Sequence, residues 1–313
     1  MKFFYAVFAF ALLSCPNFAF NLSDYRFHTM PETSYYGGIH SIAKDSIGRI
    51  WFSGYDALFM YNGKSFVQMN ELVTSHSPGY YWTYGQVITD SSGKLYVATN
   101  HGLLRFNYKK QIFQSILKGN IGAIASDGDG NIWLVVNNRV RSFGRKGFAA
   151  PVVGFLPEHS VLSTLVCCGQ NVYIGAGSKV YRLNKKTNRC SLFSSLENPG
   201  SVVRDIMEYN NSVYVLTHAD GVYECDKQGH IVKHYPLAHE NGKSTISKKL
   251  YLDASNTIWI AAQSGLFLLD PAQKQIHLLR SNLHYAYSLP NNSVWSIFPD
   301  PDGGVWIGTY GGK

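Results

Sequence analysis

Charged residues are scarce in this chain, because Asp, Glu, Lys and Arg make up only 15% of its 313 residues. A disordered chain has more charge and less apolar surface, so the sequence predicts a folded protein with a large core. Aromatic residues reach 14%, with 21 Tyr, and this favours β structure. The length fits one large all-β domain or two ordinary ones.

Cysteine is also sparse, and its spacing does not suit a metal. The chain has five Cys and no C-x-x-C pair, so we expect no metal site and no cofactor. Cys167 and Cys168 are neighbours and would face opposite sides of a strand, while Cys190 and Cys225 lie far along the chain. An oxidising compartment would permit a disulfide, but we favour thiols buried as small apolar side chains.

Long apolar runs are missing except at the N-terminus. Residues 1–20, MKFFYAVFAFALLSCPNFAF, have a basic start and an apolar run that is short for a membrane span. They predict a secretory signal peptide. We favour cleavage after Ala19 over lipidation of Cys15, because Leu13 is large for a lipoprotein site. An uncleaved anchor is the third interpretation.

The net charge of +8 comes from scattered basic residues, and their densest patch is Arg139, Arg141, Arg145 and Lys146. We expect no nucleic acid partner for an exported chain. An acidic partner such as an anionic polysaccharide stays open, although a solvated basic surface is the simpler interpretation.

Seven copies of one short pattern run along the chain. Each copy is a turn followed by a strand with an aromatic residue, as in KDSIGRIWFS, TDSSGKLYVA and DPDGGVWIG. These aromatic residues, which we call the anchors, are Trp51, Tyr96, Trp133, Tyr173, Tyr214, Trp259 and Trp306. Successive anchors are 37 to 47 residues apart, the length of a four-stranded propeller blade. The sequence therefore predicts an all-β fold for residues 21–313, a seven-bladed β-propeller with four-stranded antiparallel blades.

The turn in each copy has a physical explanation. An Asp lies six residues before the anchor in five copies, where it can cap the turn by accepting a backbone N–H. Three residues before the anchor, four copies have Gly and two have Asn, the residue types that tolerate positive φ. Because Asn replaces Gly, this position reflects a backbone requirement and not chemistry.

The last copy is incomplete. SVWSIFPDPDGGVWIGTYGGK supplies two strands, and the third strand that other copies have is absent. The segment from Ser23 to Met30 has the pattern of a fourth strand, which we expect to lie on blade seven and close the ring. We expect a truncated blade seven in a fragment of a longer protein, although a natural stop at Lys313 stays open.

Two stretches, HSIAKDSIGRIWFSGYDALFMYNGKSF and NNSVWSIFPDPDGGVWIGTYGG, resemble two-component regulator propeller repeats. Such repeats occur in the periplasmic sensor regions of hybrid two-component systems of Bacteroidetes. The resemblance implies an exported periplasmic sensor of glycans or oligosaccharides. The partners that it implies are an oligosaccharide ligand, the rest of a sensor kinase chain and, in the full-length protein, a second copy. No kinase motif is in this sequence, so membrane association and signalling are expected only through the missing part.

Two other functions stay open. A glycan-active enzyme is less favoured, because sialidase-type propellers have Asp five residues before Trp and here the spacing is six. No G-x-S-x-G or H-E-x-x-H motif occurs, and we expect no catalytic residues. A protein-binding scaffold of the WD40 type would repeat Gly-His and Trp-Asp pairs at blade spacing, and this chain does not.

The loop between the second and third strands begins four residues after each anchor. By blade symmetry these positions should ring one mouth of the central channel, and the long connection before blade two should lie on the same face. The candidate ligand-binding residues are Tyr55, Tyr81, Trp82, Asn100, His101, His218, Gln263 and Tyr310. The ring positions hold aromatic and neutral hydrogen-bonding groups and no charge, which suits a sugar.

Overall fold

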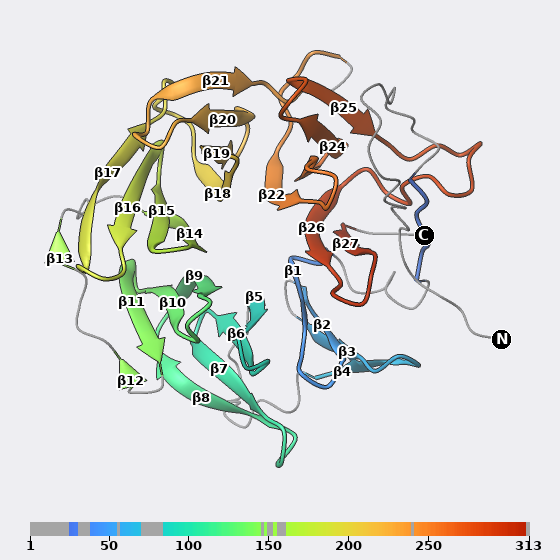
Figure 1. Cartoon of the computed structure of the whole chain (residues 1–313). Coiled ribbons are helices and arrows are strands. Elements are labelled where there is room, and N and C mark those ends of the chain that lie inside the picture. The colour runs from blue at the N-terminus through green and yellow to red at the C-terminus, as the bar shows by residue number, and fades with distance from the viewer. Residues whose placement is uncertain are drawn as a thin grey trace.

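The computed structural model describes residues 25–30, 38–54, 57–69, 84–144, 147–148, 153–154, 161–238 and 241–310. The predicted signal peptide lies outside these ranges. All regular secondary structure in them is β-strand, arranged as seven sheets around a common axis (Figure 1). Six sheets have four or five strands and the seventh has two, which confirms a propeller with an incomplete last blade.

The sheets are numbered here as blades in chain order. Blade one contains β1 (Ser41–Lys44), β2 (Ile50–Ser53), β3 (Leu58–Tyr61) and β4 (Phe66–Gln68). Blade two contains β5 (Tyr84–Thr89), β6 (Leu95–Thr99), β7 (Gly102–Asn107) and β8 (Ile112–Lys118). Blade three contains β9 (Ile121–Ser126), β10 (Ile132–Val136), β11 (Arg139–Gly144) and β12 (Gly147–Phe148). Blade four contains β14 (Leu162–Cys168), β15 (Asn171–Ala176), β16 (Lys179–Asn184) and β17 (Arg189–Ser195), with β13 (Val153–Gly154) parallel to β17.

The remaining blades follow the same plan. Blade five contains β18 (Val203–Tyr209), β19 (Ser212–Thr217), β20 (Val222–Cys225) and β21 (Ile231–Tyr235). Blade six contains β22 (Ser247–Leu252), β23 (Ile258–Ala262), β24 (Gly265–Asp270) and β25 (Gln275–Leu279). Blade seven contains β26 (Val294–Pro299) and β27 (Val305–Thr309).

The first strand of each blade is innermost, and the strands that follow it lie progressively further from the axis (Figure 1). Each first strand contacts the first strand of the next blade, and β26 contacts β1, so the ring is closed. Nowhere in the described part of the chain is there a helix with the length and hydrophobicity that a membrane crossing requires.

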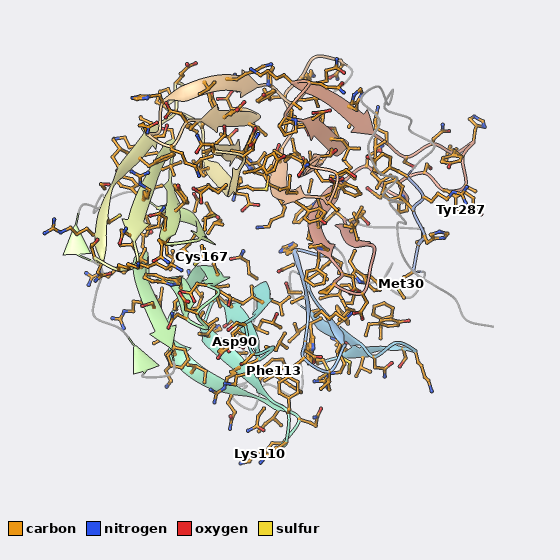
Figure 2. All side chains as sticks on the ribbon, in the orientation of Figure 1. Met30, Asp90, Lys110, Phe113, Cys167 and Tyr287 are labelled. Atoms are coloured by element: carbon orange, nitrogen blue, oxygen red, sulfur yellow. The ribbon has the colours of Figure 1, made fainter. Side chains whose placement is uncertain are left out.

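The seven anchors all lie on the second strand of their blade, as predicted. Each packs into an apolar cluster with side chains of the following blade, so the core is seven interfaces between blades. Trp51, for example, lies 4.9 Å from Phe106 and 5.8 Å from Phe113 of blade two, measured between ring centroids. Figure 2 shows Phe113 at this interface. The last interface joins Trp306 to Phe52 of blade one.

The Asp that lies six residues before the anchor makes two kinds of hydrogen bond in four blades. In blade six, Asp253 Oδ1 accepts the backbone N–H groups of Ser255 and Thr257, each at 2.8 Å. Its other oxygen, Oδ2, accepts the indole N–H of Trp259 at 2.8 Å. The same carboxylate therefore caps the turn and satisfies a buried donor. The anchors Trp51, Trp133 and Trp306 are held in the same way.

The residue three positions before the anchor has positive φ wherever it is Gly or Asn, from 65° at Asn256 to 107° at Gly303. In the copy where Gln170 breaks the pattern, the preceding residue Gly169 has the positive φ, 52°. The backbone requirement predicted for this position is confirmed.

The four described cysteines are free thiols. Cys190 and Cys225 are buried in the clusters beside blades four and five. Burial raises the pKa of Cys190 to about 11, so its thiol stays protonated and apolar in character. These residues therefore pack as small hydrophobic side chains, as favoured from the sequence.

The expected fourth strand near the N-terminus is wrong for the residues that the structure describes. Residues 25–30 form no strand. Phe27 is instead buried in the cluster between blades six and seven, and its N–H donates to Tyr287 O at 3.0 Å. Apolar burial and not sheet pairing holds this segment.

Contacts between β26 and β1 close the ring. Ser296 Oγ donates to Ile39 O at 2.8 Å, and Lys44 Nζ lies 2.6 Å from Asp300 Oδ1. Blade seven is thus joined directly to blade one through its innermost strand.

Candidate functional site

The connections between second and third strands gather on one side of the ring, which we call the loop face. Their described residues are 54, 57, 100–101, 137–138, 177–178, 218–221 and 263–264, with Tyr310 after β27. Backbone hydrogen bonds tie them to the start of the innermost strands. His218 N donates to Val202 O at 2.7 Å, and Ser247 N of the next blade donates to His218 O at 2.8 Å. We call this series of hydrogen-bonded loops the belt of loops, and it holds the predicted positions around the axis.

The structure describes five of the eight candidate residues, all on the loop face. Tyr55, Tyr81 and Trp82 lie outside the described residues. Gln263 is exposed, and Tyr310 is 55% exposed. Asn100 and His218 are half-buried. His101 is also half-buried, and its Nε2 atom is shielded from solvent.

A second set of residues at the axis was not predicted. On each first strand one residue pairs with the anchor, and we call the residue three positions earlier the axial residue of that blade. The axial residues are His40, Gly85, Gly122, Ser163, Arg204, Lys248 and Trp295. In blades two to seven they fall at a β-bulge, where the register shifts and the residue is left unpaired.

In blades two and five, the residue after the axial residue points sideways to the next blade. Asp205 Oδ2 accepts the N–H of Leu250 at 2.9 Å, and Gln86 Oε1 accepts that of Ile124 at 2.9 Å. Lys249, the residue after Lys248, points the other way, to Asp205 of blade five, and the axial residue Ser163 itself donates to Val203 O of blade five at 2.7 Å. A bulge breaks the alternation of side chains along a strand, and bulges often re-aim a side chain next to a functional site.

The axial residues divide the ring into two unequal halves. Blades two, three and four contribute Gly85, Gly122 and Ser163. The other four blades contribute His40 and the large side chains of Arg204, Lys248 and Trp295. These four, together with His218 and Tyr310 of the loop face, form what we call the axial cluster.

Aromatic stacking joins three members of the axial cluster. The ring of Trp295 stacks with that of His40 at 4.7 Å and with that of Tyr310 at 5.2 Å, with interplanar angles of 23° and 22°. Lys248 Nζ lies 4.1 Å from the centre of the Trp295 ring, a cation–π contact between blades six and seven. Gly38 packs against this stack, and a Cβ there would lie 2.7 Å from Tyr310 Cδ2.

Arg204 and His218 form the basic side of the cluster. The guanidinium atoms Nε and Nη2 of Arg204 lie 3.1 and 3.0 Å from His218 Nδ1. A guanidinium can only donate, so Nδ1 is the acceptor and the imidazole is neutral with its proton on Nε2. Two donors of Arg204 are thus used to hold its orientation, and the other nitrogen, Nη1, is not committed to this contact.

Positive charges in the axial cluster disfavour one another. Burial, followed by the charge of Arg204, lowers the pKa of Lys248. Burial, followed by Arg204 and Lys248, lowers the pKa of His218. Burial and Lys248 lower the pKa of His40, and burial lowers that of Arg204, although Arg204 is an exposed residue taken as a whole. The cluster is therefore a region of positive potential that an anion would relieve.

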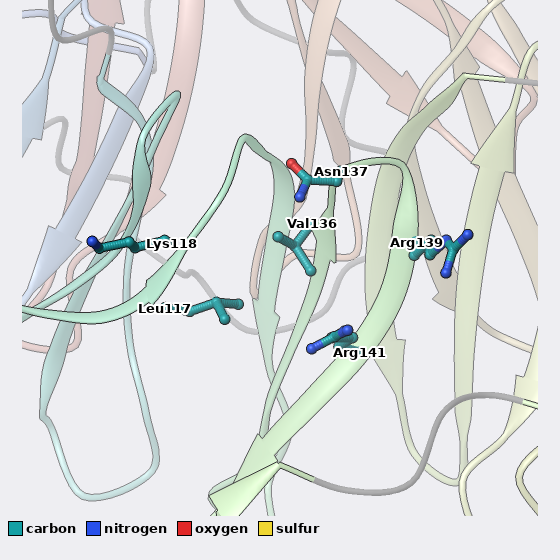
Figure 3. Close-up of a pocket in the computed structure, with 6 residues that line it drawn as sticks. All are labelled: Leu117, Lys118, Val136, Asn137, Arg139 and Arg141. Carbon is teal, nitrogen blue, oxygen red and sulfur yellow. The ribbon is translucent and has the colours of Figure 1, made fainter.

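A pocket of about 360 Å³ lies between blades two and three, which contribute no residue to the axial cluster (Figure 3). Its lining consists of Leu117, Lys118, Val136, Asn137, Arg139 and Arg141. It includes two of the four residues of the predicted basic patch, whereas Arg145 and Lys146 lie outside the described residues. Its three cations are exposed, as expected for a solvated basic surface.

A repeat alignment could have identified the axial residues. They lie eleven residues before the anchor in five copies and ten before it in the copies of Tyr173 and Tyr214. In blade order the axial residues are His, Gly, Gly, Ser, Arg, Lys and Trp, so no residue type is common to the seven copies. Only its variability among otherwise similar repeats sets it apart. The expectation of an uncharged ring was incomplete, because Arg204 and Lys248 add charge beside the predicted positions.

The fold and the belt of loops define a β-propeller with a candidate ligand site at one end of its axis. A family model described as "Two component regulator propeller" matches residues 288–311. The chain therefore contains a two-component regulator propeller repeat, which confirms the resemblance seen in the sequence. No curated protein matches the chain.

Solved structures extend the similarity to the whole ring. The extracellular domain of the hybrid two-component system BT4673 from B. thetaiotaomicron superimposes with a TM-score of 0.73 and 18% identity, over 91% of this chain and 39% of that one. The corresponding domain of BT3049 from the same organism gives 0.69 and 21%, over 88% and 39%. This chain thus spans 39% of the length of each of these extracellular domains.

An enzyme shares the fold as well. Virginiamycin B lyase from Staphylococcus aureus superimposes with a TM-score of 0.69 and 14% identity, over 90% of this chain and 94% of the lyase. At such identities the likeness shows the fold alone, and a propeller fold does not decide between sensor and enzyme.

Proposed function

We propose that this chain is the N-terminal sensor propeller of a hybrid two-component signalling protein and that it binds a glycan or oligosaccharide at its loop face. The protein would be exported to the periplasm and joined there to the rest of a sensor kinase chain. The repeat matched at residues 288–311 and the similarity to extracellular domains of hybrid two-component systems support this assignment.

The axial cluster is the observation that carries the proposal. It brings aromatic rings and hydrogen-bonding groups from blades five, six, seven and one together at one end of the axis. Aromatic faces and converging polar groups are what a sugar site requires. Tyr310, at 55% exposure, offers the most accessible ring of the cluster, and Gln263 offers an exposed amide beside it on the loop face.

Calorimetric titration of the protein with a panel of neutral and acidic oligosaccharides tests the proposal. We expect one class to bind, and Tyr310→Ala to weaken that binding by about tenfold, the effect of one lost stacking contact. Tyr287→Ala is the matched control, because Tyr287 is 42% exposed but lies in the connection between blades six and seven, away from the axis (Figure 2). Tyr55→Ala and Trp82→Ala test two predicted residues beyond the described ranges.

The same titration addresses the alternatives. An enzyme would convert the saccharide, so chromatography of the recovered ligand should show it unchanged. A protein-binding scaffold would bind no saccharide at all. Binding that Tyr310→Ala, Tyr55→Ala and Trp82→Ala all leave unchanged would remove the loop face from consideration.

A further inference from the structure

We propose that the ligand of the axial cluster is an acidic saccharide, whose carboxylate or sulfate group binds between Arg204 and Lys248. This inference rests on the proposed function, and it specifies the class of glycan. Three observations carry it. Arg204 and Lys248 have no carboxylate partner, uncharged side chains fix their orientation, and two axial positions in blades two and three are glycine.

The two cations have no carboxylate partner among the described residues, whereas five other basic residues have one. Lys44, Arg49, Lys185, Lys227 and Lys249 each lie within ion-pair distance of an Asp or Glu. Within the described ranges, no Asp or Glu lies at that distance from Arg204 or Lys248. The adjacent carboxylate, that of Asp205, is committed to Lys249 Nζ at 3.0 Å and to the N–H of Leu250. Two neighbouring cations without a counter-ion define a site for an anion.

The contacts of the two cations orient their charge without neutralising it. His218 accepts from two nitrogens of Arg204, and the Trp295 ring holds the ammonium group of Lys248. Both partners are uncharged, so the positive charge remains available. A guanidinium of fixed orientation suits the two oxygens of a carboxylate or sulfate, and an ammonium group adds a point charge.

Glycine at the opposite axial positions leaves room for the rest of the ligand. Gly85 and Gly122 have no φ in the positive range. A Cβ would meet nothing closer than 3.5 Å at Gly85 and 3.7 Å at Gly122, which is ordinary van der Waals contact. Neither backbone conformation nor local packing therefore requires glycine there. The absence of a side chain at two axial positions in blades two and three is consistent with room for the ligand opposite the cations.

The experiment compares three oligosaccharides of equal length by calorimetric titration: one neutral, one made of uronic acids and one sulfated. We expect an acidic member to bind at least about tenfold more tightly than the neutral one, because a hydrogen bond to a charged group adds that much. Whichever acid binds more tightly, uronate or sulfate, identifies the source of the negative charge. Raising the salt concentration should weaken the acidic ligands selectively.

Variants locate the site. Arg204→Gln and Lys248→Met should each lower the affinity for the acidic ligand by about tenfold and leave that for the neutral one within about twofold. Lys110→Met is the charge-matched control, because Lys110 lies at the outer tip of blade two (Figure 2). Gly122→Phe should abolish binding while the unfolding midpoint stays near that of the wild type. Gly128→Phe, in the turn after β9 with nothing within 4 Å, is its control.

The outcomes separate the two proposals. Tighter binding of an acidic ligand that Arg204→Gln, Lys248→Met and Gly122→Phe weaken supports both. Equal binding of neutral and acidic ligands, or acidic binding that the three variants do not change, overturns the inference and leaves the sensor function standing. If no saccharide binds, the proposed function itself is overturned, and the inference with it.

Discussion

The ammonium nitrogen of Lys248 lies 4.1 Å from the centre of the Trp295 ring, although the two residues belong to neighbouring blades. Both occupy the axial position of their blade, at a bulge of the innermost strand. The aromatic ring attracts the cation without cancelling its charge. Trp295 therefore joins two blades and at the same time positions a charge at the axis.

Replacing Trp295 with Leu should destabilise the ring and weaken ligand binding together. The variant loses the stacks with His40 and Tyr310 as well as the contact with Lys248. Each of these three contacts contributes about 1 kcal/mol, so we expect a loss of about 3 kcal/mol in the free energy of unfolding, measured in urea. The control is Tyr285→Leu, which removes only the edge contact with Tyr287 and should cost less than half as much. Equal losses would contradict a joining role for Trp295.

The repeat made most of the fold predictable, because its turns depend on local chemistry. Asp six residues and Gly or Asn three residues before the anchor satisfy backbone requirements that recur wherever the turn does. The N-terminal segment was misassigned for the opposite reason. Tyr25 and Phe27 alternate with polar residues as in a strand, yet contact with the cluster around Trp259 and Leu289 holds them. Alternation alone does not show whether sheet pairing or apolar packing buries a segment.

The axial cluster could not be found from residue types. Its members share a backbone feature, the bulge, and differ chemically from blade to blade. Arg204 and His218 are fourteen residues apart and meet only because the belt of loops returns His218 to the start of β18. Aligning the repeats shows that this position varies, but it does not show which of the seven side chains meet in the folded ring.

Removing the carboxylate of Asp253 should cost more than removing a carboxylate that only caps a turn. Asp253→Ala leaves the indole N–H of the fully buried Trp259 and two backbone N–H groups without their acceptor. We expect a loss of about 3 kcal/mol in urea unfolding. Asp270→Ala, whose carboxylate caps an exposed turn by accepting from Ala272 and Gln273, should lose about 1 kcal/mol.

Asp253→Asn separates the two roles further. An Asn offers one acceptor oxygen and one donor nitrogen, so it can serve either the turn or the indole. Its loss should lie between those of Asp253→Ala and the wild type. If Asp253→Ala and Asp270→Ala were equally destabilised, the bond to the indole would contribute nothing.

Two features require glycine at position 229: its positive φ and the close approach of a strand of blade four. Gly229 has a φ of 95°, and a Cβ there would lie 1.8 Å from the carbonyl oxygen of Phe193 in blade four. Gly242 has a φ of 78° and nothing within 4 Å. Gly242→Ala should therefore cost about 1 kcal/mol, from backbone strain only. Gly229→Ala should cost at least about 3 kcal/mol, because the backbone of β17 must move. Similar unfolding midpoints for the two variants would exclude close approach as the reason for Gly229.

Ring closure should weaken in acid through Asp300, whose carboxylate joins blade seven to Lys44 of blade one. Burial alone would raise the pKa of Asp300, but the hydrogen bonds from Lys44, Trp306 and the Asp302 backbone, with the charge of Lys44, outweigh it and lower that pKa from 3.8. A lowered pKa in the folded state means that the unfolded chain binds the proton first as the pH falls. The stabilisation from Asp300 is therefore complete above the unfolded value and is lost as the pH falls through the folded one.

Lys44→Met tests this closure. Its free energy of unfolding at pH 7 should fall by about 2 kcal/mol, because Asp300 keeps its indole and backbone donors but loses its charged partner. Urea midpoints between pH 5 and about pH 3 should then change less in Lys44→Met than in the wild type, since the pKa of Asp300 moves back toward its ordinary value. Lys227→Met is the control, because the Lys227 side chain pairs with Glu208 inside blade five. Hydrogen exchange at β1 and β26 should quicken in Lys44→Met and not in Lys227→Met. A wild-type acid dependence that persists in Lys44→Met would show that the ion pair between blades seven and one does not control closure.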